Sequence, residues 1–123
     1  MTSAEGRESA GRRSVRVAAA QCEIGTDVEA NIATLVRMVG EAAGRGAELV
    51  VLPEFGNHQS VYESAEHAWN VAVDLGDPED GFVVALTSAA RDSGAWVVAN
   101  ATVRRARADG GGRPRITVTQ LLF

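Results

Sequence analysis

The chain has 123 residues, of which 46% are hydrophobic and 23% are charged, and its formal net charge is −4. This length gives room for one domain, and no apolar run is long enough to span a membrane. The acidic balance argues against a broad nucleic-acid footprint, so neither nucleic acid nor membrane is an expected partner.

The use of lysine and cysteine restricts the chemistry further. All 12 basic residues are arginine, so any mechanism that needs an ammonium group must obtain it from outside these residues. The single cysteine, Cys22, allows no internal disulfide bond, which fits a reducing cytoplasm. Residues 1–14 are rich in serine, glycine and mixed charges, which predicts a disordered leader rather than a secretory signal.

The first part of the chain after this leader predicts a β-α-β unit. Val15 to Gln21 alternates weakly and predicts a strand. Thr26 to Glu29 fits a capping box, in which the threonine and the glutamate satisfy each other's free backbone donors. The helix that follows carries an apolar stripe, and Gly44 or Gly46 ends it.

A short apolar strand closes this unit. Leu49 to Leu52 is an unbroken apolar run, which predicts a strand buried on both faces. Pro53 ends the strand, because proline has no N–H to donate to the ladder. A right-handed crossover through the helix would make the two strands parallel.

Two helices and a β-hairpin are predicted for the rest of the chain, with a polar surface loop from Phe55 to Ser60 before them. These elements are expected at about Tyr62–Val73 (helix), Glu79–Ser93 (helix), Trp96–Val103 (strand) and Ile116–Phe123 (strand). The last strand runs to the final residue without a turn, cap or polar tail. We therefore expect a truncated chain, in which residues 15–123 are the N-terminal portion of a larger domain.

Glu54 is the strongest candidate for chemistry, because it stands where the Leu49 strand gives way to a loop. In layered α/β proteins, strand ends and the loops after them are where ligand chemistry is usually built. A carboxylate held beside an apolar floor would be partly desolvated, which makes it a better proton acceptor. The alternative interpretation is an ordinary solvated acid in a surface loop.

The order of these features resembles the N-terminal part of the nitrilase, or carbon–nitrogen hydrolase, superfamily. The resemblance rests on a strand ending in Gln21, a capped helix carrying Asn31, and the run Ala-Gly-Arg-Gly-Ala-Glu-Leu-Val-Val-Leu-Pro-Glu that ends at Glu54. It covers about residues 15–123 and is closest up to Phe55. It implies that this α/β chain is part of a four-layer α-β-β-α sandwich, in the order β-α-β-α-α-β-β.

The resemblance also implies a reaction and a general base. Family members attack an amide or nitrile carbon with a cysteine thiolate, while a glutamate moves the proton and a lysine stabilises the oxyanion. Glu54 matches that glutamate. Nothing in this chain matches the lysine or the cysteine, so we expect these 123 residues to be inactive by themselves. Cys22 follows the first strand in a different motif, and a packed or half-exposed structural cysteine is the favoured interpretation.

Two residues after Glu54 are candidates for the wall of a substrate pocket, namely Phe55 and His58. The alternative for His58 is a plain loop histidine. His67 is explained by a surface pair with Glu63, four residues before it. Two histidines without suitably spaced cysteines or acids make no metal site, and no cofactor is expected.

The arginines around Gly110-Gly111-Gly112 leave two interpretations open. They would suit a phosphate or nucleic-acid patch, or they would form the solvated tip of the predicted hairpin. The overall acidity of the chain favours the hairpin tip.

Three functions remain for the whole chain. The first is the N-terminal part of a cytoplasmic amidase or nitrilase-like hydrolase that acts on a small amide or nitrile and forms homo-oligomers when full length. The second is a small α/β ligand-binding module that is complete as it stands. The third is a family member that has lost catalysis and keeps a scaffold role.

Overall fold

The computed structural model describes residues 11–105 and 115–123. Within these residues the chain forms, in order, β1 (Val17–Ala19), α1 (Val28–Gly44), β2 (Leu49–Val51), α2 (Ala65–Val71), α3 (Gly81–Ser93), β3 (Trp96–Arg105) and β4 (Arg115–Leu122). The predicted α/β class and the order β-α-β-α-α-β-β are therefore confirmed. No helix in the described part of the chain is long and apolar enough to cross a membrane. Residues 1–10 of the predicted leader and residues 106–114 of the predicted hairpin turn lie outside the described residues.

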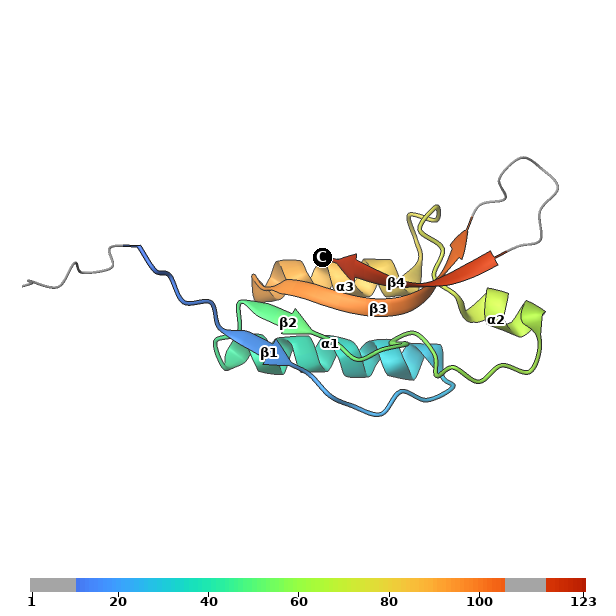
Figure 1. Ribbon diagram of the computed structural model, residues 1–123, viewed down its shortest axis with the longest axis horizontal. Helices are drawn as coiled ribbons and strands as arrows, with labels where there is room; N and C mark the ends of the chain where they lie inside the picture. The colour runs from blue at the N-terminus through green and yellow to red at the C-terminus, as the bar shows by residue number, and fades with distance from the viewer. Residues whose placement is uncertain (1–10, 106–114) are drawn as a thin grey trace, which may run out of the picture.

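The four strands form one sheet in the order β1-β2-β3-β4. β1, β2 and β3 are parallel, as a right-handed crossover through α1 requires, and β3 pairs with β4 as an antiparallel hairpin. β3 is the longest strand and lies between a parallel and an antiparallel neighbour (Figure 1). β3 therefore joins the parallel strands β1 and β2 to the antiparallel strand β4.

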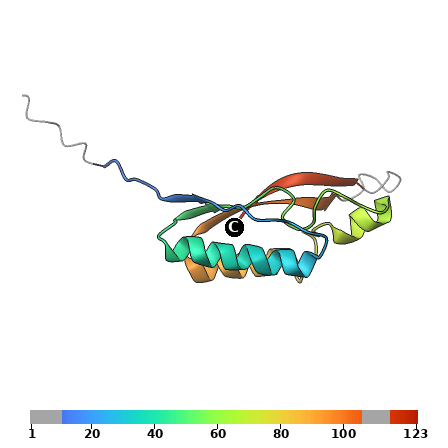
Figure 2. The same ribbon diagram turned by 90° about the horizontal axis from the view of Figure 1, so that it is seen from below.

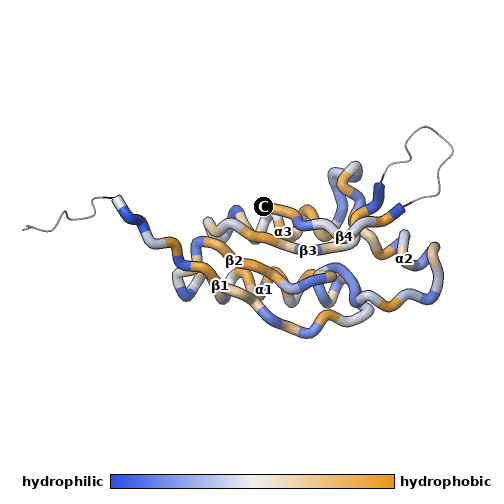
Figure 3. The backbone as a smooth tube through the Cα atoms, in the orientation of Figure 1, coloured by the Kyte–Doolittle hydropathy of each residue, from blue (hydrophilic) through white to orange (hydrophobic). Residues whose placement is uncertain are grey.

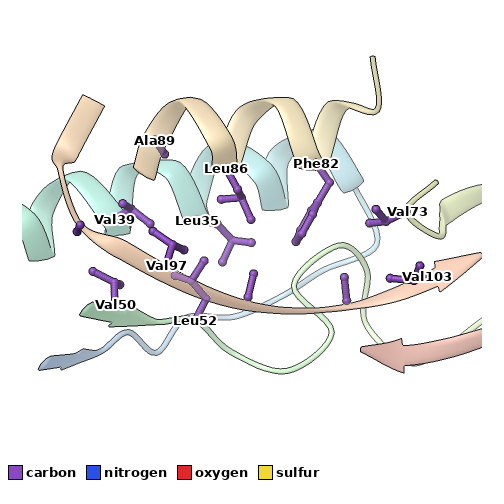
Figure 4. Packing of buried hydrophobic residues seen from close by; sticks show 13 residues of the cluster. Leu35, Val39, Val50, Leu52, Val73, Phe82, Leu86, Ala89, Val97 and Val103 are labelled. Atoms are coloured by element: carbon purple, nitrogen blue, oxygen red, sulfur yellow. The ribbon is translucent and has the colours of Figure 1, made fainter. Parts of the chain in front are cut away.

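α1 and α3 lie side by side on one face of the sheet (Figure 2). The apolar stripe of α1 contributes Leu35 and Val39, both fully buried, and α3 contributes Phe82 and Leu86. These side chains meet the inward-facing residues of the central strands, such as Val97 (Figure 4). Alternation along β3 sends every second residue into this layer, which is the core of the described chain.

The N-cap of α1 differs from the prediction, whereas α3 ends at Ser93, as predicted. Asp27, not Thr26, is the N-cap of α1, and its side chain accepts a hydrogen bond from Ala30 N–H. The predicted capping box is therefore wrong by one residue. Threonine and aspartate side chains can both accept the capping hydrogen bond, and the direction in which the chain enters the helix selects between Thr26 and Asp27. Gly94 ends α3 in the left-handed conformation (φ 67°), as its place after the apolar stripe predicts.

α2 is shorter than the predicted helix over Tyr62–Val73. Ser64 caps its start, and the helix ends at Val71. The reason lies at Val73, whose N–H donates to Thr102 O and whose carbonyl accepts from Arg104 N–H. Val73 therefore extends the ladder of β3, and a helical backbone at this residue would break both bonds.

The face of the sheet opposite the helices is uncovered in the described chain. Its strand-to-strand neighbours are largely apolar: Val17, Leu49 and Trp96 form one row, and Val51, Val98 and Leu122 lie in the next. Trp96 is 63% exposed and Leu122 is 65% exposed. Figure 3 shows hydrophobic residues along these strands. We call this surface the open face.

The open face corrects one expectation. β2 is predicted to be buried on both faces, but Val51 is exposed. Trp96, on the neighbouring strand β3, is exposed as well. The expectation treated an apolar residue in a strand as a residue with a layer on each side. In the described residues, only the helix side has such a layer.

We predict that the 123-residue chain self-associates through the open face, because a sheet that exposes a large apolar surface lowers its free energy by covering it. The double variant Trp96→Ser, Leu122→Thr should shift the molecular mass measured by light scattering towards the monomer. Val84→Ser is the matched control, since Val84 is an exposed valine on α3. A wild-type chain that is monomeric at all concentrations would contradict the prediction.

Candidate active site

Glu54 lies just past the carboxyl end of β2, at the edge where the parallel strands end. Its side chain is exposed. The expectation that an apolar floor partly desolvates it is therefore not met in the described chain, because the open face beside the strand ends carries no second layer. The position of Glu54 after the end of a parallel strand is the one that the sequence predicts.

A bulge removes Glu54 from the ladder between β2 and β3. In a parallel ladder, hydrogen bonds to the neighbouring strand recur at every second residue. Leu52 N–H donates to Val98 O at 2.8 Å, so the next bond in step would join Glu54 N–H to Asn100 O. Instead, Gly56 N–H donates to Asn100 O at 2.7 Å. Two extra residues are thus accommodated before the ladder resumes, and Glu54 lies within the looped-out segment.

Asn100 on β3 closes this bulge with two acceptors. Its backbone carbonyl accepts from Gly56 N–H, and its side-chain Oδ1 accepts from Phe55 N–H at 2.8 Å. Phe55 has a φ of 52°, the one non-glycine residue with positive φ in the described chain. This left-handed conformation costs a residue with a bulky side chain about 1–3 kcal/mol and persists only where neighbouring contacts hold it. Bulges and such outliers concentrate near active sites, where they re-aim a side chain.

Gly56 is needed because the backbone here comes close to the core. A Cβ at this position would lie 3.0 Å from Leu35 Cδ1 and 3.1 Å from the carbonyl oxygen of Asn100. The glycine therefore lets the looped-out segment return to β3 directly above α1. Any side chain would push the segment away from the strand.

Asn57 continues the same edge of β3 and is completely buried. Its Nδ2 donates to Thr102 Oγ1 at 2.8 Å and to Val71 O at 2.9 Å, and its Oδ1 accepts from Thr102 N–H at 3.1 Å. The backbone carbonyl of Asn57 accepts from Nδ2 of Asn31 on α1 at 3.1 Å. Asn31, Asn57 and Asn100 therefore attach the loop after Glu54 to α1, to the end of α2 and to β3. We call them the three-asparagine network.

This network overturns the prediction of a polar surface loop from Phe55 to Ser60. Gly56, Asn57 and His58 are buried, and the polar groups of Gly56 and Asn57 replace the partners that β3 would otherwise lack beyond β2. Sequence reasoning assigned no site role to the network. The available signal was an asparagine inside the apolar run of β3, since a buried polar side chain in a strand requires a hydrogen-bond partner.

His58 is fully buried beside two other rings. Its imidazole stacks on Tyr62, with ring centroids 5.5 Å apart, and meets His67 edge-on at 5.2 Å. His58 Nδ1 lies 2.6 Å from Gln59 O, and since a carbonyl only accepts, Nδ1 carries the proton. Within the described residues, His58 Nε2 and Tyr62 Oη are buried without a hydrogen-bond partner. His58 therefore lies beneath the loop surface, while Phe55 is half-buried next to Glu54.

His67 differs from its predicted surface pairing. Its Nδ1 accepts from the backbone N–H of Glu63 at 3.1 Å, while its ring packs against His58. Among residues 11–105 and 115–123, no group of three His, Cys, Asp or Glu side chains is arranged to hold a metal ion.

Cys22 is half-buried on the helix side of the chain segment after β1. Burial raises the pKa of its thiol, and the positive charge of Arg37 opposes this shift only in part. A thiol with a raised pKa is a poor source of thiolate at neutral pH. The geometry thus agrees with the interpretation of Cys22 as a structural cysteine.

The arginines at the start of the predicted hairpin tip bind to the protein itself. Arg104 lies over the Trp69 ring at 5.2 Å and donates to Trp69 O, and it lies near Asp74. Arg105 donates to the hydroxyl groups of Thr117 and Thr119 on β4. Of the remaining arginines of the predicted tip, Arg115 begins β4, and Arg107 and Arg113 lie outside the described residues.

These features define a class of protein: an α/β layer with a carboxylate looped out of the sheet at the carboxyl end of a parallel strand. The family model described as Carbon-nitrogen hydrolase matches residues 16–123. The chain therefore belongs to the carbon–nitrogen hydrolase family.

Replacing Asn57 with alanine should lower the free energy of unfolding by about 3 kcal/mol, because buried backbone groups of Val71 and Thr102 lose their partner. Urea denaturation at matched protein concentration measures the loss. Asn70→Ala is the control, since Asn70 is an exposed asparagine nearby on α2. Equal midpoints for the two variants would show that the network does not hold the loop.

Alkylation of Cys22 by iodoacetamide should reach half its maximal rate at a higher pH in the folded chain than in the urea-unfolded chain, because burial raises the thiol pKa. Arg37→Gln should move this midpoint higher still, since it removes the charge that favours the thiolate. Arg91→Gln, at an exposed arginine of α3, should leave the midpoint unchanged. A folded midpoint at or below that of the unfolded chain would contradict the assignment.

Proposed function

We propose that this chain is the N-terminal part of a hydrolase that cleaves non-peptide carbon–nitrogen bonds in a small amide or nitrile, with Glu54 as its general base. Membership of the carbon–nitrogen hydrolase family supports the reaction class. The single observation that carries the role of Glu54 is the bulge, which takes this carboxylate out of the ladder at the carboxyl end of β2. A carboxylate on a looped-out residue is accessible to a substrate, whereas a glutamate paired in the ladder would be an ordinary strand residue with no such access.

In this proposal, Glu54 accepts the proton of a cysteine thiol as the sulfur attacks the substrate carbon, and it returns the proton to the leaving amine. A lysine stabilises the negative charge of the tetrahedral intermediate, and water then cleaves the thioester. The chain contains no lysine, and the proposal does not use Cys22 as the nucleophile, so both groups would lie outside these 123 residues. The 123 residues alone are then inactive.

The proposal also assigns a role to the open face. The exposed rows around Trp96 and Val51 form the inner surface of a four-layer α-β-β-α sandwich, and a second sheet covers them in the full-length protein. That sheet would also enclose Glu54 and desolvate it. We further propose a reducing cytoplasmic location, consistent with the single cysteine, and a homo-oligomeric full-length protein.

A small α/β module that binds a phosphate-bearing ligand is less well supported. An open cavity of about 390 Å³ lies between the ends of α1, α2 and α3, but Asp77 and Asp80 are among the residues that line it. These carboxylates would repel a phosphate. The third function, a scaffold without catalysis, differs from the first only in whether Glu54 matters to a reaction.

Glu54→Gln in the full-length protein separates catalysis from the scaffold role. Glutamine keeps the size of the side chain and cannot take up a proton, so we expect hydrolysis of a panel of aliphatic amides and nitriles to fall by about 1,000-fold or more. Ammonia release measures the rate. Glu79→Gln is the matched control, because Glu79 is an exposed loop acid remote from β2. Undiminished activity in Glu54→Gln would show that Glu54 is not the base.

A further inference from the structure

We propose that Asn100 is a positioning residue for Glu54, and that its side-chain amide, rather than its place in the sheet, sets the direction of the carboxylate. The inference rests on the proposed function, because it concerns a residue of β3 that would orient the proposed general base, Glu54. It starts from one observation: a single residue accepts hydrogen bonds from two consecutive amides of the loop, those of Phe55 and Gly56.

The two bonds differ in what they require of the sequence. The bond from Gly56 N–H goes to the backbone carbonyl of Asn100, which any residue at this position would offer. The bond from Phe55 N–H goes to Oδ1 of the side chain at 2.8 Å. Only a short side chain with an acceptor oxygen reaches this amide. Of these two bonds, only the one from Phe55 N–H therefore depends on which residue occupies position 100.

The Phe55 amide belongs to the same peptide plane as the carbonyl of Glu54. Fixing this N–H holds the peptide unit on the carboxyl side of Glu54, while on the amino side the proline ring fixes φ of the preceding residue, Pro53. The bonds from Gly56 N–H to Asn100 O and from His58 N–H to Phe55 O hold the next peptide units of the loop. The bond to Oδ1 is the one that holds the Phe55 N–H itself, so its loss would let the Glu54–Phe55 peptide unit relax from the geometry that goes with the left-handed φ of 52° and would turn Glu54.

The surroundings of Asn100 argue against a role in packing. Its neighbours Ala99 and Ala101 point into the helix-side core, whereas Asn100 shares the opposite side of β3 with Val98 and Thr102. Asn100 is 6% exposed, because the loop that it holds covers it. Its cross-strand partner Gln120 on β4 is exposed, and within the described residues its side chain makes no hydrogen bond to the loop. Gln120 therefore provides a matched control in the same row of the sheet.

The test compares Asn100→Ala, Asn100→Asp and Gln120→Ala in the full-length hydrolase. Asn100→Ala should lower kcat by about 100-fold and change KM by less than about threefold, because the base is misdirected while substrate contacts remain. Asn100→Asp keeps an acceptor oxygen at the same place and should recover at least about tenfold of that loss. Gln120→Ala should keep the wild-type kcat.

Hydrogen exchange followed by mass spectrometry gives a second readout on the same proteins. The peptide that contains Phe55 and Gly56 should exchange faster in Asn100→Ala than in Gln120→Ala, while the β3 peptide stays protected in both. If Asn100→Ala does not fold, Asn100→Asp decides: retained kcat supports the proposal, and a loss as large as that of Glu54→Gln overturns it.

The outcomes separate the two proposals. If Glu54→Gln is inactive but Asn100→Ala matches Gln120→Ala in kcat, the positioning role is wrong and the proposed function stands. A loss in Asn100→Ala that falls on KM alone, or that Asn100→Asp does not recover, also overturns the positioning role. If Glu54→Gln keeps full activity, the proposed function itself is wrong.

Discussion

The structure depends on how the backbone N–H and C=O groups along the edge of β3 find hydrogen-bond partners beyond the end of β2. β3 has 10 residues and β2 has three, so most of this edge has no regular strand beside it. Buried backbone donors and acceptors left without partners would be costly. The chain meets this constraint with the loop after Glu54 and with Val73, which together provide bonds along β3 from Asn100 to Arg104.

The same bonds create the candidate site. Because the ladder resumes at Gly56 rather than at Glu54, the acid is expelled from the sheet where the parallel strands end. The buried side chains of Asn31 and Asn57 then hold the loop in place: Asn31 Nδ2 on α1 donates to Asn57 O, and the amide of Asn57 bonds to Val71 O at the end of α2 and to Thr102 on β3. The proposed general base is thus mounted on a loop that is attached to α1, α2 and β3, which is what catalysis by positioning requires.

The two faces of the sheet divide the roles in this chain. The helix side is closed by Leu35, Leu86 and their neighbours and supplies the hydrophobic stabilisation of the described fold. The open face is equally apolar in its central rows but is uncovered. Glu54 follows β2 at the edge of this sheet, so in the proposed four-layer sandwich the sheet that covers the open face would also enclose its carboxylate.

The sequence by itself determined the α/β order, the apolar stripes of α1 and α3, the end of α3 at Gly94 and the position of Glu54 after a strand. These features follow from periodicity and from the backbone preferences of glycine and proline, which act over a few neighbouring residues. Only the tertiary structure decided that the loop after Glu54 is buried, that Phe55 is left-handed and that Asn100 holds it. The bonds from β3 to Phe55 and Asn57 join residues 45 positions apart, and no local pattern specifies such partners.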